Sequence, residues 1–334
     1  MTDQRVSIIT PVKNGAQFLA VCLDSILNQT HQNWELVIVN DHSTDETQSI
    51  LEKYVDKDNR IKVLQNKGKG IIEALQTGYA NCSGNFITRM DADDIMTSQK
   101  LELLVNKLIE RGNGHVATGF VKYFSETKLG EGYINYQNWL NQLTQSESNF
   151  DDVYKECVIP SPCWMVSRQD FEASGGFNSD LYPEDYDLVF RFYKQGLNVT
   201  AVKEIIHHWR DYSTRTSRTD PNYSDNYFIQ LKLNYWKELD HHSTRILELW
   251  GAGKKGKEVA RFLIENKIDF DWLSNNPKKI GKNVYGVILK NSENVMRNEN
   301  PQILIAVGSM EYNREIKKAL NSKNLKPNQD YYFL

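Results

Sequence analysis

Residues 6–11 read Val-Ser-Ile-Ile-Thr-Pro, a β-branched run that ends at a proline and predicts a buried strand leading into a loop. Apolar residues then recur at helical spacing over 18–27. The alternation continues over the first hundred residues, with further strands predicted at 34–39, 61–64 and 86–88. Strands that alternate with helices are typical of βαβ units, so the sequence predicts a doubly wound α/β sheet here.

A second α/β pattern begins late in the chain. An apolar run at 246–250 is followed by Gly251-Ala252-Gly253-Lys254-Lys255-Gly256 and a helical pattern, the context in which dinucleotides bind. A whole dinucleotide needs two such halves, however, and Asn275 and Asn276 stand where the ribose-binding acid is expected. We therefore predict a Rossmann-like domain at 244–334 that is structural, acceptor-side or oligomerising, with nucleotide binding as the alternative.

The composition excludes several classes of protein. Lys and Arg number 40 against 43 Asp and Glu, and this net charge of −3 argues against a nucleic-acid-binding protein. No apolar run approaches the ~18 residues of a membrane-spanning helix, and the N-terminus lacks a signal-peptide cleavage site. The four cysteines have no metal-binding spacing, which is typical of reduced thiols. We expect a cytoplasmic protein with no transmembrane segment.

Polar and acidic residues follow three of the predicted strands. Pro11-Val12-Lys13-Asn14 follows the first, Asp41 the second, and Met90-Asp91-Ala92-Asp93-Asp94 the fourth. Because ligands of doubly wound folds bind beyond the carboxyl ends of the strands, we expect these residues to share one crevice. Two carboxylates one residue apart can hold a hard divalent cation such as Mg²⁺. The alternative is a solvated turn or a helix cap, a role open to Asp94.

Four motifs in series resemble those of the family 2 glycosyltransferases with the GT-A fold. They are residues 11–14, Asn40-Asp41-His42-Ser43-Thr44-Asp45, Asp91-Ala92-Asp93-Asp94 and Pro183-Glu184-Asp185-Tyr186-Asp187-Leu188-Val189-Phe190-Arg191. The resemblance covers about residues 5–220. It implies a GT-A doubly wound mixed sheet for this part of the chain, and the smaller Rossmann-like domain predicted from residues 251–256 follows it. It also implies inverting transfer of a sugar from a nucleotide-diphosphate sugar, usually a UDP-sugar, with Mn²⁺ or Mg²⁺.

The sequence pattern changes after about residue 112, and we expect three parts in the first domain, 1–243. A nucleotide-sugar half is expected over about 1–112, an acceptor half over about 113–220, and a helical bridge over about 221–243. The second domain is then 244–334.

The resemblance also implies roles for individual residues. Asp41 corresponds to the acid that hydrogen-bonds the uracil ring, Asp93 to the metal-ligating acid, and Asp91 to the acid beside the ribose and the metal. Asp185 corresponds to the catalytic base. Glu184 is expected either to position Asp185 or to hydrogen-bond the acceptor. Without the resemblance, Glu184 and Asp185 are simply acids at the N-terminus of a helix, where the helix dipole favours negative charge.

Further side chains are expected around this site, and several of them have a structural alternative. On the nucleotide-sugar side they are Pro11, Lys13, Asn14, Lys69, Arg89 and Arg191. On the acceptor side they are Trp164, Trp209 and Arg210. His208 is the candidate to complete the metal coordination, although His207 beside it is the alternative and both suit a plain strand end.

One position departs from the family pattern. The residue after Val12 is commonly an aromatic that stacks on the base, and here it is Lys13. A lysine stem can pack and its ammonium can meet a phosphate, but it stacks poorly. The departure therefore bears on which nucleobase is bound and not on whether a nucleotide is bound.

We predict a hexosyltransferase that moves a hexosyl or N-acetylhexosaminyl unit from a UDP-sugar to a glycan or glycolipid hydroxyl. The expected setting is cell-surface polysaccharide synthesis, with peripheral association at the inner face of the membrane and a homo-oligomer formed through 244–334. A sugar nucleotidyltransferase is one alternative, but its Gly-rich loop after the first strand is longer than Pro11 to Gly15. A nucleotide-sensing module fused to a degenerate transferase is the other, and the intact acids argue against it.

Overall fold

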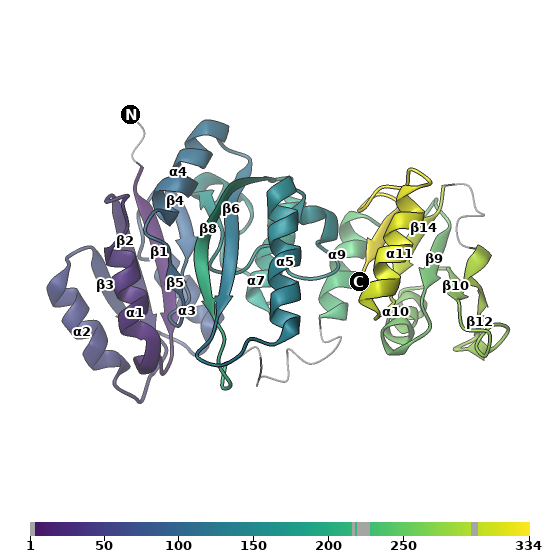
Figure 1. Ribbon diagram of the computed structural model, residues 1–334, viewed down its shortest axis with the longest axis horizontal. Helices are drawn as coiled ribbons and strands as arrows, with labels where there is room; N and C mark the ends of the chain where they lie inside the picture. The colour runs from purple at the N-terminus through teal and green to yellow at the C-terminus, as the bar shows by residue number, and fades with distance from the viewer. Residues whose placement is uncertain (1–3, 216–217, 219–227, 295–299) are drawn as a thin grey trace. The chain divides into compact units, whose positions relative to one another are not determined.

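The computed structural model describes residues 4–215, 218, 228–294 and 300–334, which form two compact units (Figure 1). The first unit comprises Met1–Phe150 and Cys157–Arg215. The second comprises Asp151–Glu156 and Thr216–Leu334, so it takes one short segment from within the sequence of the first. Both units are α/β, as the sequence predicts.

The first unit is built on an eight-stranded mixed sheet in the order β3-β2-β1-β4-β7-β6-β8-β5. Its strands are β1 (Val6–Val12), β2 (Trp34–Asn40), β3 (Ile61–Gln65), β4 (Phe86–Arg89), β5 (Ile95–Met96), β6 (His115–Phe124), β7 (Met165–Ser167) and β8 (Asn198–Arg210). Its helices are α1 (Ala16–Leu27), α2 (Thr47–Lys57), α3 (Ile71–Tyr79), α4 (Lys100–Arg111), α5 (Glu131–Ser146), α6 (Arg168–Ala173) and α7 (Glu184–Lys194). β1 to β4 run parallel, whereas β7 is antiparallel to β4 and β6.

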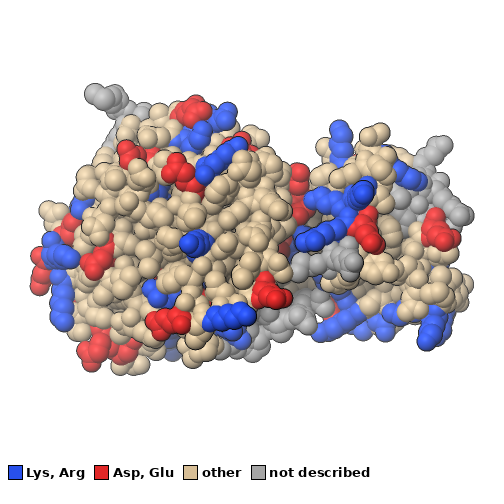
Figure 2. All heavy atoms as spheres, in the orientation of Figure 1, with Lys and Arg blue, Asp and Glu red and all other residues tan. Residues whose placement is uncertain are grey.

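The core of this unit follows from the periodicity of its sequence. β1 lies between β2 and β4 and is buried over nearly its whole length, which confirms the predicted strand at 6–10. The strands predicted at 34–39, 61–64 and 86–88 are confirmed as β2, β3 and β4. α1 buries residues three and four apart, as an amphipathic helix does. On the surface, charged side chains of both signs are interspersed over the face shown in Figure 2.

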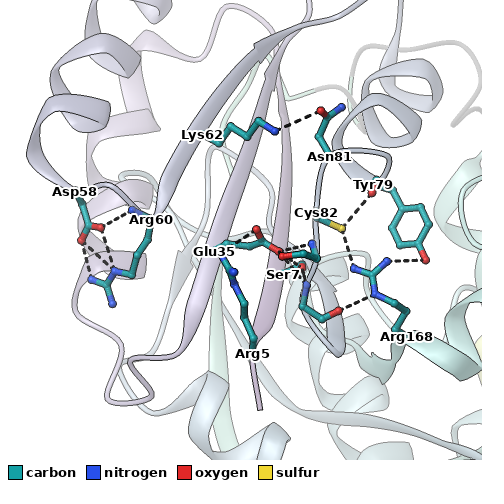
Figure 3. Close-up of polar contacts among 12 residues, drawn as sticks. Arg5, Ser7, Glu35, Asp58, Arg60, Lys62, Tyr79, Asn81, Cys82 and Arg168 are labelled. Atoms are coloured by element: carbon teal, nitrogen blue, oxygen red, sulfur yellow. Dashed lines mark hydrogen bonds and ion pairs between the residues drawn. The ribbon is translucent and has the colours of Figure 1, made fainter. Parts of the chain in front are cut away.

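The amino ends of β1, β2 and β4 are tied together by one carboxylate, that of Glu35 (Figure 3). It accepts hydrogen bonds from the Ser7 hydroxyl at 2.7 Å and the Gly84 N–H at 2.9 Å, and it pairs with Arg5 at 3.1 Å. Burial alone would raise the pKa of Glu35, but hydrogen bonds from Ser83 and Ser7 and the charge of Arg5 hold it below its usual value. This anchor fixes the parallel strands at the edge opposite their carboxyl ends.

The second unit contains a five-stranded parallel sheet in the order β13-β10-β9-β14-β15 and an antiparallel hairpin, β11–β12. The strands are β9 (Leu247–Trp250), β10 (Asp271–Ser274), β11 (Asn283–Val284), β12 (Val287–Ile288), β13 (Lys290–Asn291), β14 (Gln302–Ile305) and β15 (Tyr331–Phe333). The helices are α9 (Ile229–Leu239), α10 (Lys254–Glu265) and α11 (Met310–Asn321). The predicted bridge over 221–243 lies partly outside the described residues, and its described part, α9, belongs to this unit.

Two glycines of the predicted Gly-x-Gly-x-x-Gly motif are required by close packing. Gly251 has a φ of 125°, and a Cβ there would lie 2.6 Å from the Ala306 carbonyl oxygen. A Cβ on Gly256 would lie 2.1 Å from the carbonyl oxygen of Gly251. The motif thus lets α10 approach the end of β9, and a nucleotide-binding role stays a prediction. Among the residues that the structure describes, no helix combines the length and apolar character needed to cross a membrane.

Candidate active site

Asp41 lies just beyond the end of β2, where the chain leaves the sheet. Its Oδ1 accepts a hydrogen bond from the Asn66 side chain at 2.7 Å, and the Gly70 N–H donates to the same carboxylate at 3.1 Å. Lys13 Nζ is 3.5 Å from Oδ2, and Lys69 is exposed beside Gly70. Burial alone would raise the pKa of Asp41, but these donors and Lys13 hold it below its ordinary value. Asp41 is therefore an ionised acceptor at the carboxyl edge of the sheet.

The loops that follow β1 and β2 support each other through Asn14. This residue has a left-handed φ of 51°, a conformation that asparagine tolerates better than most residues. Its N–H donates to the Ser43 hydroxyl at 2.9 Å, and its side-chain oxygen accepts the Thr44 N–H at 2.8 Å. Pro11 lies upstream in β1, opposite Val39 of β2. Asn14 thus shapes the loop that carries Lys13.

Arg89 joins acids from two distant parts of the sequence. Its Nε donates to Asp91 Oδ1 at 2.9 Å and its Nη1 to Glu184 Oε1 at 2.7 Å, with the side chain only 6% exposed. Asp91 also accepts a hydrogen bond from the Ser161 hydroxyl at 3.0 Å. Burial opposes the ionisation of Asp91, but Arg89 and then Ser161 hold its pKa below the usual range. The ion pairs bring the end of β4 to the first residue of α7.

Asp185 follows Glu184 in the first turn of α7 and is half-buried. Its Oδ1 accepts the N–H of Tyr186 at 2.8 Å. Burial, followed by the charge of Glu184, raises the pKa of Asp185 to about 7, although Arg89 acts in the opposite direction. A carboxylate that titrates near neutrality is suited to accept a proton from a hydroxyl group.

Asp93 and Asp94 are adjacent but differ in their surroundings. Asp94 is fully buried, with Oδ2 3.0 Å from His207 Nε2 and Oδ1 accepting the Arg210 N–H at 2.7 Å. Asp93 is half-buried, and its Oδ2 accepts the Tyr212 hydroxyl at 2.9 Å. Asp94 therefore anchors the acidic loop to β8, while Asp93 is the more accessible carboxylate.

The clustered acids fit a divalent cation. Burial and then the charges of Asp94 and Asp91 raise the pKa of Asp93 to about 6. Arg215 and the Tyr212 hydroxyl act in the opposite direction, and a hard cation there would further relieve the repulsion between the acids. Over residues 4–215, 218, 228–294 and 300–334, no group of three or more His, Cys, Asp or Glu is arranged to hold a metal. A Mg²⁺-like ion bound through one or two carboxylates plus substrate phosphates needs no such group.

The histidine that meets the acids is His207, and this corrects the expectation for His208. Neighbouring residues of a strand face opposite sides, so His208 packs against Phe124, with ring centroids 6.3 Å apart. Burial and then the charge of Lys100 lower the pKa of His207 well below its usual value. His207 is thus a neutral partner of Asp94.

The packing bears on two further expectations. Trp164 is 1% exposed and lies 5.7 Å from the rings of both Phe171 and Phe192, so it belongs to the core and does not face an acceptor. Arg191 pairs with Asp187 one helical turn before it, at 2.8 Å, and donates to two loop carbonyls. Arg191 therefore braces α7, which is the structural alternative to a contact with the nucleotide.

Arg210 and Trp209 end β8 beside the acidic loop. The Arg210 guanidinium lies 4.3 Å from the Phe18 ring centroid and 4.5 Å from that of Phe124. Its Nε donates to the backbone carbonyl oxygen of Asp93 in the acidic loop at 2.7 Å. Trp209 stacks on Tyr123, with centroids 4.8 Å apart and planes inclined by 10°. Arg210 thus supports the acidic loop, and the acceptor-side role of Trp209 stays a prediction.

Three residues that hold the acids belong to none of the sequence motifs. Asn66 follows β3 at the same sheet edge as Asp41, so its place after a parallel strand is the signal that indicates it. Ser161 and Tyr212 lie in loops without a recognisable pattern, and only the tertiary fold brings them to Asp91 and Asp93.

Residues 7–175 match the family model described as glycosyl transferase family 2. The chain is 32% identical over 157 residues to glycosyltransferase GlyA of Streptococcus pneumoniae serotype 4 (strain ATCC BAA-334 / TIGR4), an alignment that covers 46% of this chain and 22% of GlyA. It is 28% identical to the putative teichuronic acid biosynthesis glycosyltransferase TuaG of Bacillus subtilis (strain 168), over 49% of this chain and 62% of TuaG. The alignments thus span less than two thirds of either relative.

A solved structure shares the fold. The crystal structure of S. aureus TarS 1–349 in complex with UDP-GlcNAc superposes with a TM-score of 0.54 at 17% identity, covering 71% of this chain and 68% of that chain. This likeness supports the predicted GT-A fold. Because the family model spans half of the sequence and includes the loops that carry Asp41, Asp91 and Asp93, the chain belongs to glycosyl transferase family 2.

Proposed function

We propose that the protein transfers a hexose or N-acetylhexosamine, with inversion, from a UDP-sugar to a glycan hydroxyl during cell-surface polysaccharide synthesis. The family supports glycosyl transfer. A relative named for teichuronic acid biosynthesis supports a polysaccharide product, and the UDP-GlcNAc complex of TarS makes UDP-GlcNAc the first donor to test.

One observation carries the proposal. Arg89 pairs with Asp91 and with Glu184, so an acid at a strand end and the start of α7 share one buried cation. Asp185, the next residue, has a pKa of about 7. The arrangement supplies a donor-side acid and a base of suitable strength on two separate elements, as single displacement requires.

Donor binding is assigned to the edge formed by the loops after β1, β2 and β4. Asp41 is an ionised acceptor for an N–H of the base, and Lys13 beside it can meet a phosphate. Asp93 would hold Mn²⁺ or Mg²⁺, with Asp91 beside it. When bound, such an ion neutralises charge on the diphosphate leaving group as a Lewis acid.

The chemical step is assigned to Asp185. Its carboxylate accepts the proton of the acceptor hydroxyl while that oxygen bonds to the anomeric carbon. The bond from that carbon to the diphosphate breaks, and its electron pair leaves with the nucleoside diphosphate. One displacement inverts the anomeric configuration. Glu184 is assigned as a positioning residue, because its carboxylate pairs with Arg89 and its charge raises the pKa of Asp185.

A donor screen tests the proposal. Purified protein is incubated with UDP-, GDP- and dTDP-sugars, with and without Mn²⁺, and release of the nucleoside diphosphate is measured. We expect release from a UDP-sugar that depends on the cation. Release from none of the donors, or transfer of a nucleotidyl group with pyrophosphate formation, would contradict the proposal.

A further inference from the structure

Charge is divided unevenly along the chain. Residues 244–334 contain 16 Lys and Arg against 10 Asp and Glu, whereas residues 1–243 contain 24 against 33. The end of the chain is therefore positive in a protein whose net charge is −3. An asymmetry of this kind points to an anionic partner for the positive part.

The positive charge is concentrated around the β11–β12 hairpin. No Asp or Glu occurs from residue 272 to 292, a stretch with four lysines. Lys278 and Lys282 are exposed before the hairpin, and Lys290 after it pairs with Asp271 at 2.6 Å. The hairpin turns at Tyr285 and Gly286, both with positive φ.

The start of α10 adds to the same region. Lys254, Lys257 and Arg261 are exposed at helical spacing, alongside the acids Glu258 and Glu265. Arg261 Nη2 donates to the Tyr285 hydroxyl at 2.8 Å. Lys279 Nζ donates at 2.6 Å to the Ala252 carbonyl just before the helix. These two contacts hold the hairpin segment against α10.

Apolar side chains are exposed among these cations. Ile288 is 58% exposed, more than any other large hydrophobic side chain that the structure describes, and Tyr285 is 44% exposed. Ile264, one turn after Arg261, is 39% exposed. An exposed isoleucine gains nothing from contact with a soluble polyanion. The interface of a bilayer, in contrast, can bury apolar and aromatic side chains that lie next to lysines.

We propose that this basic hairpin surface (Lys254, Lys257, Arg261, Lys278, Lys282, Tyr285 and Ile288) docks on an anionic lipid bilayer. Its lysines and arginine are attracted to the lipid headgroups, while Ile288 and Tyr285 enter the headgroup layer. The proposal does not depend on the donor or the reaction, because none of these residues belongs to the candidate active site. It gives the membrane association expected from the sequence a definite surface.

Co-sedimentation of the full chain with vesicles tests this assignment. We expect binding to vesicles of phosphatidylcholine mixed with phosphatidylglycerol, no binding to phosphatidylcholine alone, and weakening as salt increases. The double variant Lys278→Glu/Lys282→Glu should weaken binding about 25-fold or more, given the contribution of each basic residue at an anionic surface. Lys254→Glu/Lys257→Glu should act in the same direction.

A matched variant separates this surface from charge in general. Lys318→Glu/Lys323→Glu makes the same charge change at exposed sites on and after α11 and should leave binding nearly unaltered. Ile288→Ser should weaken binding without any change of charge. Failure to bind the anionic vesicles, or equal loss in the α11 variant, would overturn the proposal. Full binding by Ile288→Ser would point to a soluble polyanion and would also overturn it.

Discussion

Asp41 and Asp93 both follow parallel strands, yet their surroundings have opposite effects on ionisation. Asp41 receives hydrogen bonds from Asn66 and Gly70, which lower its pKa against the effect of burial. Asp93 is buried beside two other acids, which raise its pKa to about 6. The donors around the first carboxylate outweigh its burial, whereas Arg215 and the Tyr212 hydroxyl do not outweigh the burial and the neighbouring acids of the second.

This contrast predicts different responses to metal removal. Asp93→Ala should weaken UDP binding in Mn²⁺ by about 10-fold or more but change it little in EDTA, because the lost contact runs through the ion. Asp41→Ala is the matched variant and should weaken binding in both conditions. Calorimetric titration with UDP measures this, and equal loss in both conditions for Asp93→Ala would show that it does not act through a metal.

The pKa of Asp185 predicts a pH dependence. Below about pH 7 the carboxyl is protonated and cannot act as a base, so kcat should rise as the pH increases through about 7. Glu184→Gln removes the neighbouring charge that raises this pKa, leaving the effects of Arg89 and of burial. The midpoint of the kcat profile should then move to lower pH, while exposed Glu204→Gln leaves it in place. A midpoint that stays or rises in Glu184→Gln contradicts the assignment.

The sequence predicts the acids of the site better than it predicts the residues that hydrogen-bond them and shift their pKa values. Asp91 and Asp185 were expected from their motifs, but Ser161 could not be, because its contact with Asp91 spans 70 positions and leaves no local pattern. Trp164 shows the converse. The sequence cannot tell whether a tryptophan lines a site or fills a core, and here stacking on Phe171 buries it.

The strands of the first unit can be predicted from the sequence, because short apolar runs rich in β-branched residues are typical of buried strands. α5 cannot be predicted in this way, because its sequence is polar and its buried residues are only Leu140, Leu143 and Thr144. The segment Asp151–Glu156 is equally invisible in sequence, although it belongs to the second unit. It continues into the loop that carries Ser161, the donor to Asp91.

Asp152 is the polar anchor of that segment. Its carboxylate is buried and lies 3.0 Å from Lys317 Nζ and 3.5 Å from Lys155 Nζ. Asp152→Asn should lower the free energy of unfolding by about 1–3 kcal/mol, because charge-assisted hydrogen bonds are lost. Exposed Asp151→Asn is the matched control and should cost little. Thermal unfolding of the full chain measures both, and equal stability of the two variants would contradict the anchoring role.

Tyr154 belongs to the short segment that the second unit takes from within the first, and it packs against the end of the chain. Tyr154 is 1% exposed, donates to Asp240 Oδ2 at 2.5 Å and lies 5.5 Å from the ring of Tyr332. Removal of 244–334 would uncover its ring. We expect residues 1–240 to melt at a lower temperature than the full chain and to bind a hydrophobic dye.

The same deletion also separates stability from donor binding. Asp41, Asp91, Asp93 and Asp185 all lie before residue 240, so any folded fraction of residues 1–240 should still bind UDP. An unchanged melting temperature without dye binding would show that 151–156 is not held by residues 244–334. Loss of UDP binding by a well-folded fragment would show that donor binding needs the deleted residues as well.

Asp185 is proposed as the base of the sugar transfer. Its most direct test is the turnover of Asp185→Asn with a UDP-sugar and a verified acceptor, alongside UDP affinity. Exposed Asp180→Asn, five residues earlier, is the control. We predict that Asp185→Asn lowers kcat by roughly 100-fold or more, the scale of a lost general base, with UDP affinity and the control unchanged. Near-normal transfer by Asp185→Asn would contradict the account.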